Sequence, residues 1–490
     1  MSKFNSKSTP EMTTTYEGGK LYKQSLENEW VNSLFSSFLE DGFYKSAEER
    51  IDNYQDLTLK MIEKYGPLFA AKAAVFARNE LGMRSVANLT MAMVNDYQFD
   101  GKRDVFARYF RRPDDVAEVF AAIESNCSKR SHGAVRGAAK YLSGLNDYSL
   151  MKYQMSGKQY NMFDLINITH ATSWAIDAYK AGTLSLPNTW EVRISAAKND
   201  EEKFDIWADL ISTGSLGYLA LVRNLRNILS VSSYAANKRD FIDEVLCPAI
   251  ENERAIKKSL IFPYQIYCAY KSLMDSCYND FAVCASLDRA FRTAVSNMPT
   301  LDGKNVIVLD VSASMSQPIS AKSNMSILEV GACYAAAMVV SHSSDFDFYK
   351  FGIKAKICDY DADMNVFTLI RRMCDNDQCG YGTAITPVFQ SFKDSYDRIF
   401  LISDMQVMDS NSYWQGCGVL DAVSAMRAYT KNYGQSHIYS FDLATYHSCI
   451  KNPDSDNITM LTALNDKVFS LLKYFENGGN VIEAIKSISV

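Results

Sequence analysis

The sequence predicts a multidomain protein in which an α-solenoid of HEAT-like helical repeats is followed by an α/β domain with a mostly parallel sheet. Two observations support this fold class. Residues 25 to about 295 carry apolar residues at three- and four-residue spacing and little strict alternation, which favours successive helical hairpins. From about residue 300, short β-branched and aromatic runs alternate with helical segments, which is typical of a sheet covered on both faces.

The N-terminal segment, residues 1–20, is polar and has no apolar core of the kind found in secretory signals. We expect it to be a flexible arm. No run of about 18 uncharged apolar residues occurs, so a membrane span is not expected. The 11 cysteines are scattered without a CxxC pair, which argues against a disulfide framework or a zinc site. We therefore expect a cytoplasmic protein.

The helical module is predicted to span residues 21–298. The segment at 46–66 has helical apolar spacing and ends at a Gly-Pro pair, which is a helix with a stop signal. The next segment opens with Pro67, a residue tolerated in the first helical turn. Further helices are expected at 114–127, 131–145, 205–214, 216–230 and 262–276.

The α/β domain is predicted to span residues 299–490. Its expected elements alternate between strand and helix, which implies parallel strands joined by crossover helices. The strands are expected at 305–310, 345–352, 397–404 and 437–443. The helices are expected at 325–342, 384–395, 418–432 and 480–489.

Polar oxygen-bearing residues follow the ends of the apolar strands. Asp310 ends the first strand, Ser312 and Ser314 follow it, and Asp404 ends a later strand, whereas Thr383 lies in a glycine-flanked loop. Ligands of open α/β sheets bind at the carboxyl ends of the strands, so these groups are expected to meet there. Carboxylates and hydroxyls suit a hard cation such as Mg²⁺ or Mn²⁺. The alternative is that the strand-terminal aspartate only caps the following helix.

The string DVSAS at residues 310–314 makes this half similar to a von Willebrand factor A domain, a Rossmann-like fold with a metal-ion-dependent adhesion site. The resemblance implies that Asp310, Ser312 and Ser314 bind the metal directly and that Thr383 is the second-loop ligand. It makes Asp404 the third-loop aspartate, which often acts through water. The implied cofactor is a divalent cation, Mg²⁺ or alternatively Mn²⁺.

The charge distribution bears on nucleic-acid binding. The net charge is −6, and residues 301–490 contribute 15 basic and 21 acidic side chains, so the first 300 residues are neutral with 36 of each. Any nucleic acid must therefore be held by a local basic face. Basic residues concentrate between Lys72 and Lys140, and Arg223 and Arg226 lie three residues apart on one predicted helix face. Arginine forks suit phosphate oxygens.

Several strings of the helical half occur in the order of the TROVE module, namely those at 73–84, 152–173, 189–196, 219–229 and 262–271. Together with the A domain they make the chain similar to the Ro ribonucleoprotein family. The resemblance implies a monomeric ring of HEAT-like repeats closed by the A domain. It further implies that single-stranded ends of misfolded noncoding RNAs bind in a basic central hole and small Y RNAs on the outer surface, for RNA quality control.

The expected RNA-binding residues combine the basic cluster with positions that match the family. Asp164, Leu165 and His170 match a family segment on the Y-RNA surface, and Lys152 and Lys158 match its basic positions. Read without the resemblance, His170 is a core or capping histidine, and Arg78 belongs to a structural network with Asn79 or Glu80. The full set is Arg78, Arg84, Lys129, Arg130, His132, Arg136, Lys152, Lys158, His170, Arg223 and Arg226.

No arrangement of catalytic residues is evident in the sequence. It contains 5 histidines, none in an HExxH frame, and no P-loop. We therefore expect a binding protein without catalytic residues. Two alternatives stay open: a metal-dependent protein-interaction scaffold that uses the adhesion site, and a metal-dependent nuclease. A protein partner such as an exoribonuclease is also expected.

Overall fold

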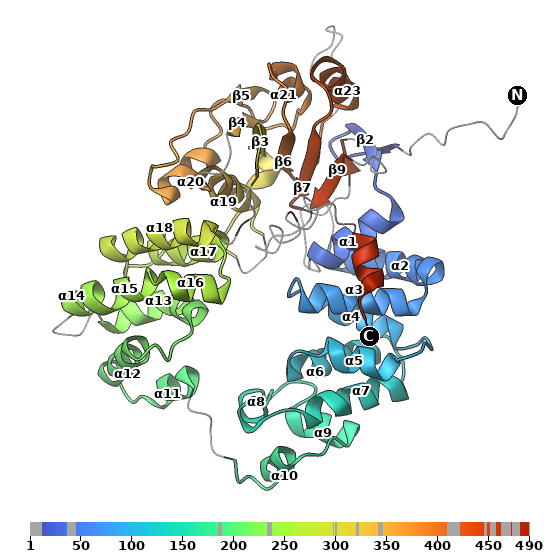
Figure 1. Ribbon diagram of the computed structural model, residues 1–490, viewed down its shortest axis with the longest axis vertical. Coiled ribbons are helices and arrows are strands. Elements are labelled where there is room, and N and C mark those ends of the chain that lie inside the picture. The colour runs from blue at the N-terminus through green and yellow to red at the C-terminus, as the bar shows by residue number, and fades with distance from the viewer. Residues whose placement is uncertain are drawn as a thin grey trace, which may run out of the picture. The chain divides into compact units, whose positions relative to one another are not determined.

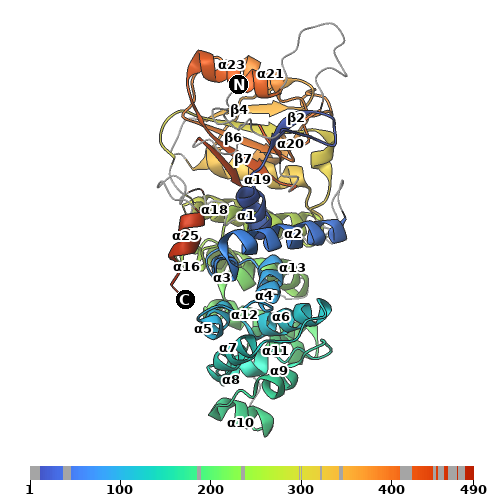
Figure 2. The same cartoon turned by 90° about the vertical axis from the view of Figure 1, so that its right-hand side faces the viewer.

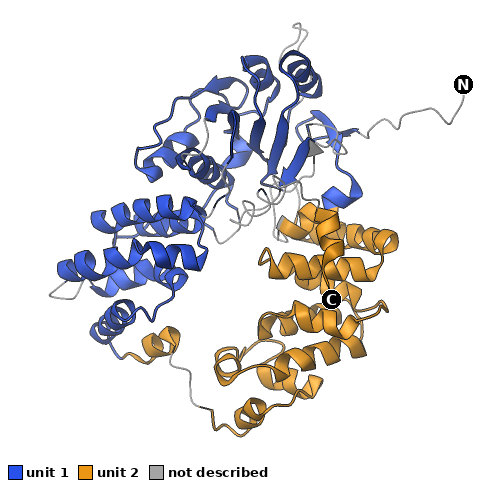
Figure 3. Ribbon diagram, in the orientation of Figure 1, with its two compact units in different colours: residues 1–29, 41–45, 198–474 blue, residues 30–40, 46–197, 475–490 orange. Residues whose placement is uncertain are grey.

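In the computed structural model the chain forms two compact units (Figure 3). Unit 1 comprises residues 1–29, 41–45 and 198–474, and unit 2 comprises residues 30–40, 46–197 and 475–490. The residues described are 12–36, 46–184, 189–232, 238–296, 298, 301–319, 323–341, 346–408, 422–444, 448–450, 457–461, 472 and 481–489.

Unit 2 is built from helices packed side by side (Figure 2). Helix α3 packs on α2, α4 and α5, and beyond it alternate helices pack together, α4 on α6, α5 on α7 and α7 on α9, as expected for stacked helical hairpins. Its described helices are most of α1 (Leu26–Ser36, with residues 26–29 in unit 1), α2 (Ala47–Tyr65), α3 (Pro67–Asn79), α4 (Ser85–Val94), α5 (Lys102–Tyr109), α6 (Pro113–Ser125), α7 (His132–Ser143), α8 (Asp147–Lys152), α9 (Met162–Thr169), α10 (Trp174–Lys180), α11 (Trp190–Ala196) and α25 (Val481–Ser487).

Helix α2 shows how the sequence sets the boundaries of these helices. The Ser46 hydroxyl accepts a hydrogen bond from the Glu49 amide at 3.2 Å, and the Glu49 carboxylate accepts one from the Ser46 amide at 2.8 Å. Gly66, with φ of 85°, ends the helix, and Pro67 begins α3. The predicted stop signal at Gly-Pro is confirmed.

The C-terminal helix α25 belongs to unit 2. It packs against α3, and the Lys72 ammonium donates a hydrogen bond to the Lys486 carbonyl at 3.0 Å. Arg108 of α5 likewise donates to the Ser489 carbonyl. The C-terminal end of the described chain is therefore held by residues of α3 and α5. Local periodicity does not predict this long-range contact.

Unit 1 begins its helical part with α12 and continues to α18. Helix α17 packs on α13, α18 and α19, so these helices are joined directly to the α/β domain. The rings of Tyr270 and Phe367 stack there at 3.8 Å between centroids, and Lys271 pairs with Glu329. The elements are α12 (Asp200–Ser212), α13 (Tyr218–Ser232), α14 (Lys238–Asp240), the π-helical η1 (Phe241–Leu246), α15 (Cys247–Ile250), α16 (Glu253–Ser259), α17 (Pro263–Met274) and α18 (Phe281–Val295).

The α/β domain is a twisted sheet with helices on both faces (Figure 1). Its described strands lie in the order β5-β4-β3-β6-β7-β9, all parallel except β5. They are β3 (Asn305–Asp310), β4 (Phe346–Phe351), β5 (Ala355–Ile357), β6 (Arg398–Ser403), β7 (His437–Asp442) and β9 (Ile458–Leu461). The helices are η2 (Ala313–Ser316, 3₁₀), α19 (Ile327–Val340), α20 (Val366–Cys374), α21 (Thr386–Ser391) and α23 (Ala422–Tyr433).

Strand β3 forms the centre of this domain, and all of its residues are buried. Val306 and Val308 share a core with residues of α21 and α23. Leu309 points to the opposite face, where it meets Gly331 of α19. A continuous apolar strand is what burial on both faces requires. The predicted fold class, helical repeats followed by a mostly parallel α/β domain, is confirmed.

The N-terminal residues differ from the flexible arm predicted for residues 1–20. Strands β1 (Met12–Thr14) and β2 (Lys20–Lys23) form an antiparallel hairpin, and β2 pairs with β8 (Ser448–Cys449). The prediction is corrected for residues 12–20. No local pattern predicts this strand, because Tyr22 pairs with Cys449, a residue very distant in the chain.

Among the described residues, no helix is both long and apolar enough to cross a membrane.

Candidate metal centre and nucleic-acid interface

The candidate metal centre lies where the strand order of the sheet reverses. Strand β3 is flanked by β4, which follows it in the chain, and by β6, which comes later. Such a reversal separates the loops that leave adjacent strands and opens a crevice at their carboxyl ends. Asp310 ends β3 and Asp404 follows β6 directly, so the topology brings both predicted carboxylates to this crevice.

Asp310 is fully buried and held by neutral donors. Its Oδ1 accepts a hydrogen bond from the Ser312 amide at 2.9 Å, and its Oδ2 accepts one from the Ser403 hydroxyl at 2.6 Å. The hydroxyl oxygens of Ser312 and Ser314 lie 3.2 Å apart. The D-x-S-x-S spacing thus turns one carboxylate and two hydroxyls toward a common region.

The electrostatics of the centre are those of excess negative charge. Burial, together with the negative charge of Asp404, raises the pKa of Asp310 to about 7. Burial also raises the pKa of Asp404, and the Ser314 hydroxyl that donates to it acts in the opposite direction. A bound cation would favour the charged forms of both carboxylates and so relieve this cost.

Backbone hydrogen bonds fix the three loops to one another. The Ala313 amide donates to the Tyr381 carbonyl at 2.9 Å, which joins the first loop to the second. The Met408 amide donates to the Thr383 carbonyl at 2.9 Å, which joins the third loop to the second. Thr383 is buried between these contacts. The structure therefore brings together the loops that carry all five predicted ligands.

Three residues that the sequence analysis did not single out position these loops. The Asn376 side chain donates to the carbonyls of Val311 and Gly380 at 3.0 and 2.9 Å, and so joins the first loop to the second. Buried Lys350 donates to backbone carbonyls at the end of α20 and to the Asp377 carboxylate. Ser403, which orients Asp310, is the last residue of β6. Only the position of Ser403 next to Asp404 could have marked it in the sequence.

The donor set fits a hard divalent cation. It offers two carboxylates and three hydroxyls, with no imidazole or thiolate among them, which matches the oxygen preference of Mg²⁺ and Mn²⁺. Within the described part of the chain, no three His, Cys, Asp or Glu side chains come together as a metal-holding group. Hydroxyls or waters would therefore have to supply part of the coordination. The ligand roles of Asp310, Ser312, Ser314, Thr383 and Asp404 stay predictions.

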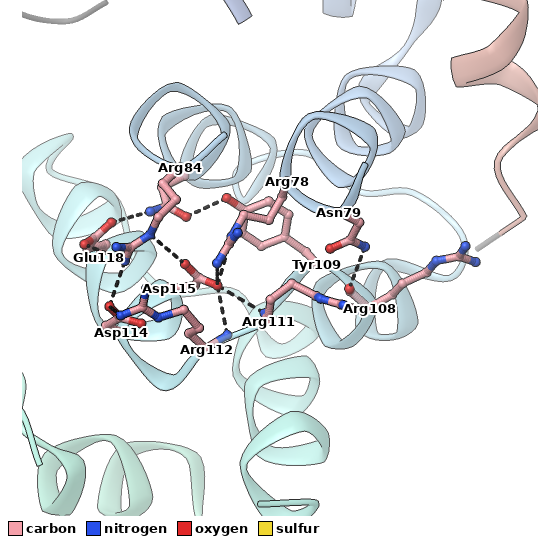
Figure 4. A network of polar contacts seen from close by, with 11 residues as sticks. Arg78, Asn79, Arg84, Arg108, Tyr109, Arg111, Arg112, Asp114, Asp115 and Glu118 are labelled. Atoms are coloured by element: carbon pink, nitrogen blue, oxygen red, sulfur yellow. Dashed lines mark hydrogen bonds and ion pairs between the residues drawn. The ribbon is translucent and has the colours of Figure 1, made fainter. Parts of the chain in front are cut away.

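Arg78, a predicted RNA-binding residue, lies in a structural network of unit 2 (Figure 4). It is buried, and its Nε and Nη2 donate to Asp115 Oδ2 at 3.1 and 2.9 Å. The amides of Arg111 and Arg112 donate to the same oxygen at 3.1 and 3.0 Å. These contacts support a structural role for Arg78. Its partner is Asp115, however, and not Asn79 or Glu80 as predicted from the RNE string.

Arg84 joins the same network from its more open side (Figure 4). It contacts Asp114 at 2.8 Å, Glu118 at 3.1 Å and Asp115 at 3.4 Å. Asn88 also donates to Glu118. The positive charges of Arg78 and Arg84 are therefore matched by adjacent carboxylates, which reduces the field they can present to a phosphate.

Most of the other predicted basic residues of unit 2 are exposed. Lys129, His132, Arg136 and Lys158 are exposed, and the described residues offer no ion-pair partner to their side chains. Arg130 is half-buried between the rings of Phe120 and Tyr160, and it donates to the Tyr160 hydroxyl at 2.9 Å. The first four can meet a phosphate without breaking an existing contact.

The residues that the family resemblance places on the Y-RNA surface differ in exposure and in their contacts. Lys152 contacts Glu191 at 3.4 Å and the Tyr148 hydroxyl at 3.1 Å. Asp164 forms a capping box with Asn161 at the start of α9, which gives it a structural role. His170 is exposed and takes the left-handed conformation, φ 54°, at the end of the same helix. It occupies a capping position, one of the roles expected without the resemblance.

Arg223 and Arg226 lie on the solvent side of α13 in unit 1. Both are exposed, whereas Leu221, Val222 and Leu225 are buried on the opposite side of the helix. No ion-pair or hydrogen-bond partner of either guanidinium is found among the described residues. The predicted shared helix face is present and available to a ligand.

Part of the chain is similar to known proteins in sequence. The profile of the TROVE domain matches residues 151–280. Telomerase protein component 1 of Rattus norvegicus is 30% identical over 100 residues, which is 20% of this chain and 4% of that protein. The Mus musculus protein of the same name is 30% identical over 90 residues, 18% of this chain and 3% of that protein. The chain thus spans only a small part of the curated relatives it matches.

The fold as a whole also has a counterpart among solved structures. The Ro (RSR) protein of Deinococcus radiodurans matches with a TM-score of 0.64 and 15% identity, over 93% of this chain and 100% of that chain. At this identity the match shows a shared fold. The TROVE match over residues 151–280 and the full-length match in fold agree with the resemblance to the Ro ribonucleoprotein family that the sequence predicts.

Proposed function

We propose that this protein binds noncoding RNA and that single-stranded ends of misfolded RNAs are among its ligands, in a role in RNA quality control. The observation that carries the proposal is the exposed arginine pair of α13, which has no partner among the described residues and lies inside the segment matched by the TROVE domain. Two adjacent guanidinium groups can contact successive phosphates of a flexible strand. Because such contacts release counterions, affinity is expected to fall steeply with salt.

The test is binding of a fluorescent hairpin RNA with a single-stranded 3′ tail, measured by anisotropy at several salt concentrations. The double variant Arg223→Glu, Arg226→Glu is expected to lose at least about tenfold in affinity and to show a smaller salt slope. The matched control is Lys393→Glu, Lys431→Glu, which makes the same charge change at exposed positions of the α/β domain. Unchanged affinity of the arginine variant would count against the proposal.

We further propose that small Y-like RNAs bind a second surface of unit 2 that includes Lys158 and His170. Both side chains are exposed, and both positions lie inside the matched TROVE segment. Lys158→Glu with His170→Glu is expected to weaken a structured RNA that lacks a tail and to leave the tailed RNA of the first experiment unaffected. Equal losses for both RNAs would contradict a separate surface.

A second candidate function is metal-dependent protein interaction through the α/β domain. It is favoured by the buried, negatively charged cluster of Asp310 and Asp404, with hydroxyl donors beside it. A divalent cation held there would act as a Lewis acid toward one oxygen of an acidic partner. Asp310→Ala is expected to abolish capture of such a partner, for example an exoribonuclease, and to leave RNA affinity unchanged. Loss of RNA binding with every partner retained would refute this candidate.

The same preparation tests for nuclease activity. We propose that the protein is not an enzyme, and the tailed RNA is therefore expected to stay intact after prolonged incubation with Mg²⁺ or Mn²⁺. Cleavage that depends on Asp310 would instead assign a catalytic role to the metal centre.

A further inference from the structure

The turn of the N-terminal hairpin lies against the third loop of the candidate metal centre, residues 404–408. The Tyr16 amide donates to the Gln406 side-chain oxygen at 3.0 Å, and the Gly19 amide donates to the Val407 carbonyl at 3.1 Å. Both segments belong to unit 1. The loop that follows strand β6 is therefore held from one side by a segment almost 400 residues earlier in the chain.

The contact between turn and loop is close enough to require glycine. A Cβ atom at Gly19 would lie 2.3 Å from the Val407 carbonyl oxygen, so any larger residue would push the turn away from the loop. The Thr15 hydroxyl donates to the same carbonyl and accepts from the Gly19 amide at 3.0 Å. Thr15 and Gly19 thus form the contact with the loop together.

Apolar packing holds the hairpin and the loop together beneath this contact. Leu21 and Tyr22 of strand β2 are buried in the same core as Met405 and Val407 of the loop. Tyr22 also pairs with Cys449 of β8. Because this apolar surface is removed from water only when the hairpin is in place, its burial favours the docked hairpin.

The hairpin reaches two predicted metal ligands through single residues of the loop. The Gln406 amide donates to Asp404 Oδ1 at 3.1 Å, while the Gln406 side chain accepts from the turn. Met408 forms a bridge with Gly18, and its amide donates to the Thr383 carbonyl at 2.9 Å. A shift of the turn would therefore be felt at both Asp404 and Thr383.

The backbone of the loop depends on such outside support. Met405 is buried and has φ of 57°, the left-handed region that side chains other than glycine rarely adopt. A strained residue of this kind persists only when surrounding contacts hold it. The hairpin contacts the two residues that follow, Gln406 and Val407. Without those contacts the loop is expected to relax and to carry the Asp404 carboxylate with it.

We propose that the N-terminal hairpin, residues 12–23, sets the cation affinity of the metal centre by holding the third loop in position. This inference rests on the metal centre proposed above, and it makes Thr15 and Gly19 positioning residues for that centre. With the hairpin undocked, Asp404 and Thr383 lose their fixed placement and the cation is held less tightly. Because coupling is reciprocal, a bound cation favours the docked hairpin by the same factor.

The coupling has a consequence for the second candidate function. An acidic partner that binds through the cation needs the hairpin docked, since the cation is held most tightly in that state. Any event that displaces the hairpin would then weaken the partner without touching the surface that the partner contacts. The hairpin would thus regulate metal-dependent binding at the α/β domain.

The first test is calorimetric titration of the full-length protein with Mn²⁺. Gly19→Val, which forces the turn away from the loop, is expected to weaken Mn²⁺ by roughly tenfold or more. Thr15→Val removes one hydroxyl donor with little change of shape and is expected to weaken Mn²⁺ by a smaller factor. Thr14→Val, the same change at an exposed position of β1, is the matched control and is expected to bind as the wild type does. If circular dichroism shows that Gly19→Val is unfolded, Thr15→Val decides the outcome.

The second test measures hydrogen exchange of the Tyr16 and Gly19 amides, which both donate to the loop. Saturating Mn²⁺ is expected to slow their exchange in the wild type by about the factor that Gly19→Val loses in affinity. In Asp310→Ala, Mn²⁺ should leave both rates unchanged. A hairpin with a merely structural role would exchange at the same rate with and without Mn²⁺.

The outcomes separate this inference from the metal centre on which it rests. If Asp310→Ala abolishes Mn²⁺ binding but the folded hairpin variants bind as tightly as wild type, the centre exists and the hairpin does not set its affinity. If the wild type binds no Mn²⁺, or Asp310→Ala binds it equally well, the metal centre fails and the role of the hairpin fails with it. Weaker binding by the hairpin variants, together with slower exchange in the presence of Mn²⁺, supports both.

Discussion

Two buried aspartates, one in each compact unit, are stabilised in opposite ways. Asp115 in unit 2 receives two guanidinium contacts from Arg78 and two backbone amides, so its negative charge is met by a cation built into the fold. Asp310 in unit 1 receives one hydroxyl and one amide and lies close to a second carboxylate. The first arrangement is complete as it stands, whereas the second favours a cation from solution.

The largest change in the free energy of unfolding is expected when Asp115 is replaced. Asp115→Ala leaves the Arg78 guanidinium buried without a carboxylate, and it should lower the free energy of unfolding by about 3–5 kcal/mol. Denaturant titration monitored by circular dichroism measures this. Asp104→Ala is the control, because Asp104 pairs with Lys140 in the open and its loss should change little. A small loss for Asp115→Ala would mean that the network is not structural.

For Asp310, in contrast, we expect that neutralising the carboxyl group raises the free energy of unfolding. The pKa of Asp310 is raised in the folded state to about 7, so the folded protein binds this proton more tightly than the unfolded chain does. The protonated carboxyl of Asp310 therefore contributes to stability at low pH, and this contribution is lost as the pH rises from about 4 through 7. With a chelator, Asp310→Asn should thus be more stable than wild type at pH 8 by roughly 2–4 kcal/mol, with the gap closing toward pH 4.

That prediction is checked by thermal or denaturant unfolding of both proteins across the pH range. The variant Asp397→Asn, whose carboxylate accepts from the Lys304 amide at the other end of β3, is the control for aspartate replacement in the same sheet. A gap between wild type and Asp310→Asn that does not vary with pH would contradict the raised pKa.

Cation addition should convert the incomplete arrangement into a complete one. At pH 8, Mg²⁺ at about one hundred times its dissociation constant should stabilise the wild type by about 2–3 kcal/mol. Asp310→Asn should gain nothing, because the ligand charge is gone. Chelator-treated samples without added Mg²⁺ give the baseline. Equal stabilisation of both proteins would show that Mg²⁺ binds elsewhere.

The smallest effect is expected at the edge of the Asp115 network. Arg84→Ala removes a partly exposed guanidinium from carboxylates that water can reach, so a loss of about 1 kcal/mol is expected. Arg103→Ala, an exposed arginine on the neighbouring helix α5, should be close to neutral. A loss for Arg84→Ala as large as that for Asp115→Ala would erase the distinction between the buried and open parts of the network.

The two aspartates also differ in how far the sequence predicted them. Asp310 and Asp404 end apolar strands, and parallel topology brings strand ends together, so their proximity could be inferred. Asp115 reads only as an acidic residue at the start of a helix, and nothing local indicates that Arg78 returns to meet it. The strand and helix pattern of both halves was predictable because burial imposes its period on the sequence.

The structural features that the sequence did not predict depend on contacts between segments far apart in the chain. The hairpin of residues 12–23 pairs with β8, and Asn376 links two loops of the α/β domain through its amide. Neither has a periodic or compositional signal, because a single side chain or a short strand decides each contact.

The packing of α25 against α3 has a consequence for synthesis on the ribosome. Residues 67–79 emerge early, but the helix that covers them, Val481–Ser487, is translated about 400 residues later. At roughly 5–20 residues per second, this leaves the surface of α3 uncovered for about 20–80 seconds. During that interval a nascent chain presents this surface to whatever factors attend the exit tunnel, so chaperone engagement should concentrate on this part of unit 2.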